Sequence, residues 1–145
     1  MYYCKIPLRL IPIEEDGVHV LVDAFINRKK ANLLIDTGAS KTVFDLSRIR
    51  RFMPDEETAF ERSPHMSTGL GSSTIESHIT SIKLFRIGEA RIKNYPAVLL
   101  DLSHVNKSYE ILGIPPIDGV IGSDLLKYLR AQINFLSESL KVYHQ

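Results

Sequence analysis

Hydrophobic and polar residues alternate with a period of two along most of the chain, which is typical of β-strands. The alternation is clearest over residues 18–26, where one face is formed by Val18, Val20, Val22, Ala24 and Ile26. A polar turn over residues 27–30 separates this stretch from the short apolar run at residues 33–35. We therefore expect a β-hairpin whose second strand ends at Asp36.

Further strands are predicted at residues 5–13, 74–87, 90–95, 97–101, 120–121, 131–135 and 140–143. The two prolines in residues 5–13 favour an edge strand, because proline has no N–H to donate to a neighbouring strand. The alternation breaks between Ile79 and Ile82, which predicts a bulge or a bend. Pro96 is expected to divide residues 90–95 from 97–101.

Two short segments have helical character. Residues 104–112 follow Ser103 as a possible N-cap and precede Gly113, and their apolar stripe is Leu102, Val105, Tyr109 and Leu112. Residues 124–130 form the second predicted helix, with Ser123 as its cap. The pattern thus predicts one mostly β domain over residues 1–145 with two short helices.

Composition excludes several classes of function. Eighteen basic side chains nearly balance seventeen acidic ones, so the formal charge of +1 favours no nucleic-acid partner. The single cysteine, Cys4, forms no internal disulfide, and no apolar run is long enough for a transmembrane helix. We expect a cytoplasmic protein without membrane contact. The five histidines show no helical pairing, so we expect no metal and no cofactor.

The segment with the clearest chemistry is residues 33–40, LLIDTGAS. Asp-Thr-Gly is also a good turn sequence, so a plain tight turn is the alternative. The buried strand before it would instead hold the Asp36 carboxylate rigidly at the edge of the core. A pair of such carboxyls about 3 Å apart shares a proton, so one acts as a base on water while the other donates to a carbonyl. Thr37 can bond to an opposing loop, and Gly38 permits close approach and unusual dihedral angles.

Residues 33–40 resemble the active-site loop of retropepsin-like aspartic peptidases. A second match is residues 118–126, DGVIGSDLL, which is similar to the C-terminal signature of that family. Residues 66–73, with Gly69, Leu70 and Gly71, resemble its flap, a hairpin that covers the substrate. The three segments follow the family order over about residues 18–136.

The resemblance implies a closed acid-protease barrel with one C-terminal helix, to which residues 102–113 add a short helix. It implies a catalytic loop formed by Asp36, Thr37 and Gly38, and substrate contacts from Ala39, Ser40, Gly69, Leu70 and Gly71. It further implies structural support from Val120, Ile121, Gly122, Ser123 and Asp124. Because the chain holds a single Asp-Thr-Gly, the resemblance implies a homodimer that hydrolyses peptide bonds with one Asp36 from each subunit.

Three positions depart from the family pattern. Many viral members have Asp and Arg, as an ion pair, where this chain has Ser40 and Ser123. We expect a weaker hydroxyl contact, or a link from Ser40 to Asp124, in place of that ion pair, and therefore a weaker dimer. Ala39 lacks the hydroxyl that other members place beside the catalytic Asp. With one donor fewer, the carboxyl pair is expected to keep its proton to higher pH.

Other interpretations stay open or are set aside. A non-catalytic relative that uses the fold for dimerisation or peptide binding is the main alternative to a peptidase. Asp118 is a weak candidate for a second carboxylate within one chain, because it falls where a turn residue is expected. The sequence lacks a P-loop, and it lacks a Gly-x-Ser-x-Gly elbow.

Overall fold

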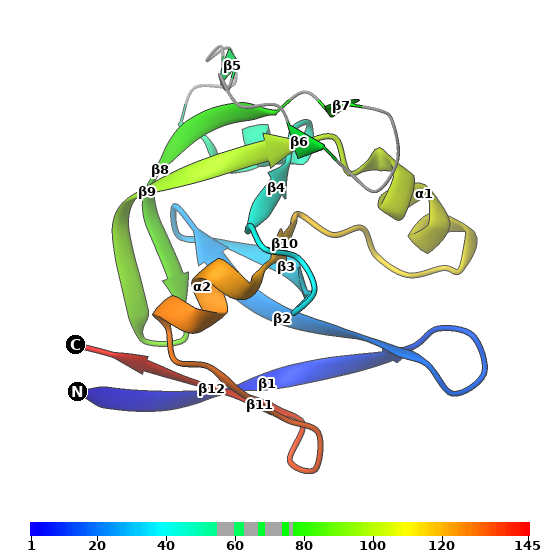
Figure 1. The fold of residues 1–145 in the computed structure, drawn as a ribbon, viewed down its shortest axis with the longest axis vertical. Helices are drawn as coiled ribbons and strands as arrows, with labels where there is room; N and C mark the ends of the chain where they lie inside the picture. Colours follow the sequence, from blue (N-terminus) through cyan, green and yellow to red (C-terminus); the bar gives the residue numbers. More distant parts are fainter. Residues whose placement is uncertain (55–59, 63–66, 69–73, 76) are drawn as a thin grey trace.

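The computed structural model describes residues 1–54, 60–62, 67–68, 74–75 and 77–145. Most of the described elements are strands (Figure 1). The strands are β1 (Tyr2–Pro12), β2 (Val18–Ile26), β3 (Lys29–Ile35), β4 (Val43–Asp45), β5 (Glu61–Arg62), β6 (Ser67–Thr68), β7 (Thr74–Ile75), β8 (His78–Ile87), β9 (Ala90–Leu100), β10 (Gly119–Ile121), β11 (Gln132–Asn134) and β12 (Ser139–His144). The helices are the 3-10 helix η1 (Arg48–Phe52) and the α-helices α1 (Ser103–Ile111) and α2 (Ser123–Tyr128).

Six strands close into a barrel. They follow the order β2-β3-β10-β4-β9-β8, and β2 pairs again with β8 to complete the ring. Two of the pairings, β3 with β10 and β4 with β9, are parallel. Closure removes the free strand edges that an open sheet of this size would expose. The predicted closed acid-protease barrel is therefore confirmed.

The β2–β3 hairpin forms as predicted. Its turn residues Asn27 and Arg28 have positive φ angles of 50° and 70°, which is typical of the two-residue turn that suits strand twist. The Asn27 side chain also donates to the Phe52 carbonyl and accepts from the Leu84 amide. The turn is therefore anchored to η1 and β8, so the far end of β3 leaves the hairpin in a defined direction.

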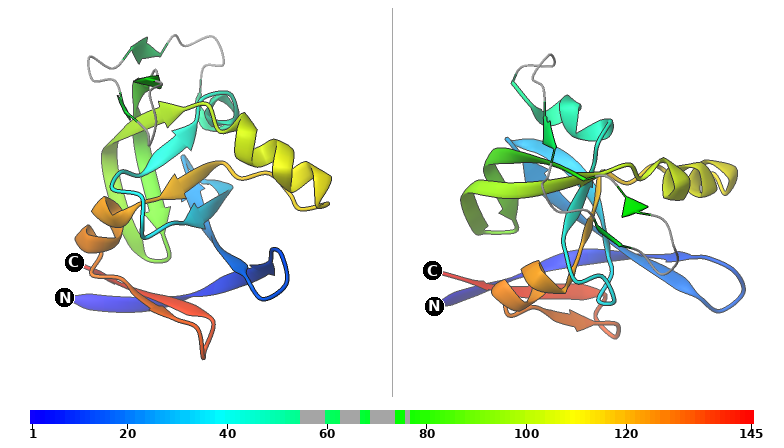
Figure 2. Two further views of the ribbon diagram at one scale, coloured as in Figure 1. Left: turned by 45° about the vertical axis from the view of Figure 1, so that its right-hand side comes forward. Right: turned by 45° about the horizontal axis from the view of Figure 1, so that its top comes forward.

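Strand β1 pairs with two neighbours in succession. Its first half, Tyr2 to Pro7, lies against β12, and its second half, Leu8 to Pro12, lies against β2. Each half of β1 is thus an edge with one strand partner, as the prolines predicted, although the whole strand lies between β12 and β2. Because each half of β1 has a strand partner on one side only, the proline nitrogen, which carries no hydrogen, can face the unpaired side. Figure 2 shows the resulting small sheet of β1, β11 and β12, which brings the two termini together.

Strands β8 and β9 differ from the prediction in two ways. Their register runs unbroken from His78↔Leu99 to Ile82↔Tyr95, which excludes a bulge, one of the two irregularities expected between Ile79 and Ile82. The irregular backbone is instead on β9, next to Tyr95, where Asn94 has a φ of 52°. Pro96 does not divide β9 either. Pro96 precedes the part of β9 that pairs with β4, so on that side no neighbouring strand requires a hydrogen bond from a backbone N–H at this position.

The two α-helices begin without the predicted serine caps. The N-cap residues are Leu102 and Gly122, and neither Ser103 nor Ser123 supplies a side-chain cap. Asp101 instead accepts a hydrogen bond from the Ser103 amide at 2.9 Å and satisfies a free donor at the start of α1. Gly113 ends this segment with a φ of 73°, as expected.

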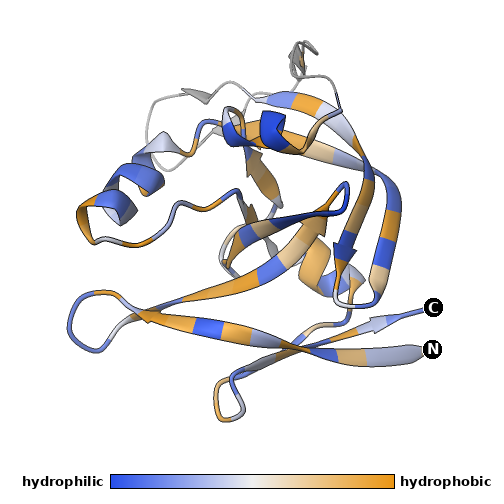
Figure 3. Ribbon diagram, turned by 180° about the vertical axis from the view of Figure 1, so that it is seen from behind, coloured by the Kyte–Doolittle hydropathy of each residue, from blue (hydrophilic) through white to orange (hydrophobic). Residues whose placement is uncertain are grey.

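The large apolar core fills the barrel and the space beneath α2. Figure 3 shows the alternation of hydrophobic and hydrophilic residues along β8 and β9, while α1 is mostly hydrophilic. A smaller buried cluster lies under α1 and contains Leu21, Tyr109, Ile117 and Val120. Leu112, expected in the apolar stripe of α1, is instead exposed. In the part of the chain that the structure describes, no helix has both the length and the apolar character to cross a bilayer.

Candidate active site

Asp36 lies immediately after the buried strand β3. Ile35, the last residue of β3, faces Ile121 of the parallel strand β10. The Asp36 amide continues this pairing and donates to the Ile121 carbonyl at 2.9 Å. The side chain itself is exposed. A rigid element therefore presents the Asp36 carboxylate to solvent, which agrees with the position expected from the sequence.

The loop over residues 36–42 packs against the start of α2. The Ala39 amide donates to the Asp36 carbonyl at 3.1 Å, and the Ser123 amide donates to the Ala39 carbonyl at 2.7 Å. A Cβ on Gly122 would lie 2.7 Å from the Lys41 carbonyl oxygen and 2.8 Å from that of Ala39. Those distances leave no room for a side chain, so glycine at residue 122 allows β10 to support the loop from below.

Gly38 has a narrower role than the sequence suggested. Its amide donates to Asp36 Oδ1 at 2.9 Å, which fixes the orientation of the carboxylate. An added Cβ would lie 3.3 Å from the same oxygen. The glycines with positive φ in the described residues are Gly88 and Gly113, so Gly38 does not adopt the unusual dihedral angle that we expected. A side chain at residue 38 would therefore crowd the Asp36 carboxylate.

Thr42 is the residue that connects the loop to α2, and the sequence did not predict it. Its hydroxyl donates to Asp124 Oδ1 at 2.7 Å and accepts from the Gly122 amide at 3.0 Å. Its own amide donates to the same Asp124 oxygen at 2.9 Å. The predicted link from Ser40 to Asp124 is wrong, since the bonds of that carboxylate go to Thr42 and to the Leu125 amide. The threonine two residues after Ser40 was the feature of the sequence that could have indicated the true partner of Asp124.

Tyr95 of β9 extends this network. Burial raises the pKa of the Tyr95 hydroxyl to about 12, with a further contribution from the negative charge of Asp124. A side-chain hydrogen bond to Thr42 acts in the opposite direction. Tyr95 also packs against Phe85, with ring centroids 5.1 Å apart. The network therefore joins the Asp36 loop to the barrel wall.

Asp118 has a structural role. Its carboxylate accepts from Arg48 Nε and from the Asn32 amide, each at 2.8 Å, and it is 4% exposed. Asn32 lies four residues before Asp36 on β3, a separation of about 13 Å along a strand. Asp118 and Asp36 therefore stand at opposite ends of the same strand pair, so Asp118 cannot complete a carboxylate pair within this chain.

The structure thus brings several predicted site residues together. Asp36, Thr37, Gly38, Ala39 and Ser40 form one loop, and the loop rests on residues 120–124. The predicted contacts Gly69, Leu70 and Gly71 lie outside the described residues. On either side of them, β6 and β7 pair antiparallel with Thr68 opposite Thr74. Within the described chain, the one group of His, Cys and acidic side chains close enough to hold a metal does not include Asp36.

The sequence matches one family model. Residues 22–125 match the model described as "Aspartyl protease", which covers more than half of the chain and includes both the Asp36 loop and the supporting strand β10. A search of curated proteins found no match.

Solved structures share the fold at low sequence identity. A retropepsin-like aspartic protease from Rickettsia conorii matches with a TM-score of 0.59 and 19% identity, covering 99% of this chain and 91% of that one. The retroviral protease-like domain of Ddi1 from Leishmania major matches with a TM-score of 0.55 and 17% identity, covering 84% and 86%. The protease of EIAV matches with a TM-score of 0.53 and 19% identity, covering 86% of this chain and 100% of that one. Together with the family model, these matches place the chain in the aspartyl protease family with a retropepsin-like fold.

Proposed function

We propose that this chain is one subunit of a homodimeric aspartic endopeptidase, with a single domain over residues 1–145. The observation that carries the proposal is the exposed Asp36 carboxylate on a loop fixed by backbone hydrogen bonds. An aspartic peptidase requires two carboxyls that share a proton. Because the described chain offers no second free carboxylate beside Asp36, the partner carboxyl comes from Asp36 of another copy, related by a two-fold axis.

The other two acidic residues considered for the site, Asp118 and Asp124, are already engaged. Asp118 is paired with Arg48 at the other end of β3. Asp124 accepts hydrogen bonds from Thr42 and Leu125. Neither is available to share a proton with Asp36. The exposed loop is therefore half of a site, and a second copy of the same loop supplies the geometry that the reaction needs.

The proposed reaction uses a water molecule held between the two Asp36 carboxyls. The ionised carboxylate removes a proton from the water as its oxygen attacks the scissile carbonyl. The neutral carboxyl donates its proton to the carbonyl oxygen, which gives a tetrahedral intermediate. In the collapse, the carboxyl that took the proton from water passes it to the leaving amine nitrogen, and a hydroxyl of the intermediate gives its proton to the other carboxylate. The C–N bond breaks, and the pair returns to its starting state. The hydrogen bond from the Gly38 amide keeps Asp36 Oδ1 oriented during the cycle.

The substrate is proposed to be an extended peptide. Ser40 is exposed beside the catalytic residues, whereas Ala39 is partly buried against the smaller apolar cluster. Strands β6 and β7 pair antiparallel, and the flap expected over residues 66–73, with Leu70 at its tip, is proposed from the sequence. An extended peptide would pair its backbone with such strands, while its alternate side chains enter separate pockets.

The central experiment compares wild-type protein with Asp36→Asn on a peptide library. Asp16→Asn is the matched control, since Asp16 is an exposed aspartate in the β1–β2 turn. We expect cleavage by the wild type and by the Asp16 variant, and none by Asp36→Asn. Equal cleavage by wild type and Asp36→Asn would refute the peptidase.

Mixing the proteins tests the shared site. If subunits exchange freely, an equal mixture of wild type and Asp36→Asn contains about a quarter wild-type dimers. The specific activity of the mixture should therefore fall to about half of the value expected from the wild-type content. Activity equal to the value expected from the wild-type content would show that each chain acts alone. Peptide binding without cleavage by the wild type would favour the alternative, a non-catalytic binding or dimerising module.

Two properties of the proposed dimer follow from its sequence. Ser40 and Ser123 are both exposed and carry no charge, so these two positions form no ion pair with each other. We expect a dissociation constant above the nanomolar range, measurable by sedimentation. The missing hydroxyl at Ala39 predicts an activity optimum above about pH 4. A cytoplasmic location remains a prediction from the sequence.

A further inference from the structure

Three side chains from separate elements converge at the end of the barrel near the termini. Cys4 lies on β1, His144 lies on β12, and Glu89 lies in the turn between β8 and β9. Alternation along β1 places Cys4 on the same face as the buried Ile6, and alternation along β12 places His144 on the face of the buried Val142. Cys4 pairs directly with Val142, so Cys4 and His144 are diagonal neighbours on the inner face.

The β8–β9 turn fits closely over these two strands. Gly88 has a φ of 58°, and a Cβ on it would lie 2.7 Å from Cys4 Sγ. The Glu89 amide donates to Cys4 Sγ at 3.4 Å. Close approach of the turn therefore places the Glu89 carboxylate beside the thiol and the imidazole.

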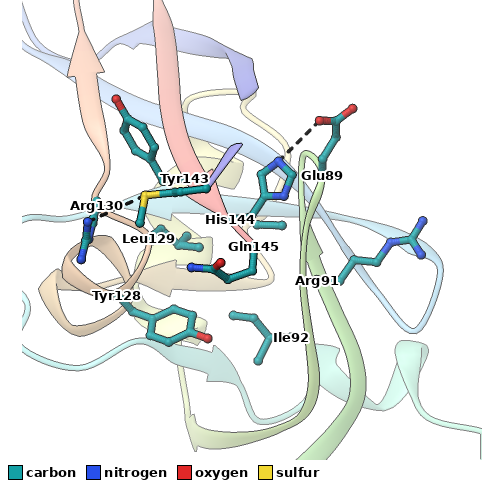
Figure 4. A pocket seen from close by; sticks show the side chains of 11 residues that line it. Glu89, Arg91, Ile92, Tyr128, Leu129, Arg130, Tyr143, His144 and Gln145 are labelled. Atoms are coloured by element: carbon teal, nitrogen blue, oxygen red, sulfur yellow. Dashed lines mark hydrogen bonds and ion pairs between the residues drawn. The ribbon is translucent and has the colours of Figure 1, made fainter. Parts of the chain in front are cut away.

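The three ligand atoms lie close together. Cys4 Sγ, a Glu89 carboxylate oxygen and a His144 ring nitrogen are all within 4.8 Å of one another. His144 Nε2 is 3.5 Å from Glu89 Oε2 (Figure 4). A tetrahedral zinc ion with ordinary Zn–N and Zn–O distances would separate these two ligands by about 3.4 Å. The pair thus already has the spacing of one edge of a zinc tetrahedron.

The His144 nitrogen has no hydrogen-bond partner. Its Nε2 atom is buried, and an unpaired buried polar atom is unfavourable. The facing Glu89 carboxylate offers only acceptor atoms when ionised. A proton on His144 would allow the imidazole to donate to the Glu89 carboxylate, but it would leave the sulfur out. A metal ion would bind the imidazole, the carboxylate and the sulfur together.

We propose that Cys4, Glu89 and His144 bind a single transition-metal ion of the zinc type. The combination of sulfur, imidazole and carboxylate suits a borderline-soft ion such as Zn²⁺ rather than Mg²⁺ or Ca²⁺. Glu89 is 72% exposed at its side chain, so it can close the remaining distance without disturbing the core. The sequence predicted no metal site because its histidines have no helical spacing. In the fold, the ligands come from positions 4, 89 and 144.

Two of the three proposed ligands border a cavity. Glu89 and His144 border a cavity of about 340 Å³ that is also lined by Ile92, Tyr128 and Gln145 (Figure 4). Three protein ligands with an open fourth position leave room for a water molecule. The ion would also join β1 and β12 to the β8–β9 turn. Because the first half of β1 pairs with β12 alone, metal binding is expected to hold this strand on the barrel.

The test uses the full chain without a polyhistidine tag. Zinc content is measured after equilibrium dialysis, and Co²⁺ is used as a spectroscopic substitute. Cys4 is the only cysteine, so a sulfur-to-cobalt charge-transfer band reports this residue alone. We expect about one zinc ion per chain, and the cobalt band in the wild type. Cys4→Ser, Glu89→Gln and His144→Gln should each weaken zinc binding, by more than about 100-fold for Cys4 and His144.

His104→Gln is the matched control, since His104 is exposed on α1 and distant in sequence from the three ligands. It should bind zinc as the wild type does. Unchanged zinc binding in Cys4→Ser and His144→Gln would overturn the proposal. A second measurement needs no variant: zinc should slow alkylation of Cys4 in the wild type. Equal alkylation rates with and without zinc would likewise overturn the proposal, leaving a protonated His144 paired with Glu89.

Discussion

Replacing Thr42 with valine tests whether the buried hydroxyl holds the Asp36 loop. Valine has nearly the same shape, so the change removes the hydroxyl without creating a cavity. Thr42 is 2% exposed, and its oxygen makes the bonds to Asp124 and Gly122. The amide of Thr42 still donates to Asp124, so part of the network survives.

The expected loss of stability follows from those bonds. A hydrogen bond to a charged group contributes about 1.5–3 kcal/mol, and a buried N–H left without an acceptor costs about 1–3 kcal/mol. Asp124 keeps two backbone donors, and the loop can relax slightly. We therefore expect Thr42→Val to lower the free energy of unfolding by about 2–4 kcal/mol. For a chain of this size, that corresponds to a fall in Tm of roughly 5–15 °C.

Urea unfolding followed by circular dichroism measures this difference. Thr80→Val is the matched control, because Thr80 lies on β8 opposite Ala97 and outside the network. It should change the unfolding free energy by no more than about 0.5 kcal/mol. A double-mutant cycle with Asp124→Asn should give a coupling energy of about 1 kcal/mol, since the two side chains share a bond.

The result that would refute this reasoning is a Thr42→Val protein as stable as the Thr80→Val control. Such a protein would show that backbone hydrogen bonds alone hold the loop. A coupling energy near zero in the cycle would likewise show that the bond to Asp124 contributes nothing measurable to stability.

Three further changes test other parts of the structure. Gly122→Ala should lower the unfolding free energy by about 1–3 kcal/mol in urea, because its Cβ would meet backbone atoms at 2.7 Å; an unchanged value would contradict the close approach. Backbone and side-chain hydrogen bonds to Ser103 lower the pKa of Asp101 from 3.8, so its stabilisation is present above that pH and is lost as the pH falls through the lowered value. Asp101→Ala should thus lower Tm slightly at pH 7, with a difference that shrinks in acid. Burial raises the pKa of Tyr95 from 10.0 to about 12, so its stabilisation is present below pH 10 and is lost as the pH rises through 12. In alkaline unfolding curves, Tyr95→Phe should therefore lose less stability than the wild type as the pH rises from 10 to 12.

Much of the fold follows from local sequence. Alternation predicted β2, and the apolar run before Asp36 predicted β3, because burying one or both faces of a strand imposes those patterns. Gly113 ended its helix as predicted, since a positive φ favours glycine. The Asp-Thr-Gly tripeptide located the candidate site because its residue types suit one particular chemistry.

Contacts between distant segments were decided by the tertiary structure. The hydroxyl of Thr42 meets Asp124 only because β10 passes between β3 and β4. Local pattern gave the wrong caps for both helices and the wrong partner for Asp124, since several nearby serines offered the same chemistry. Cys4, Glu89 and His144 likewise come together through barrel closure and strand register. Sequence spacing carries information about neighbours along one strand or helix, whereas such sites depend on which strands pair and in which register.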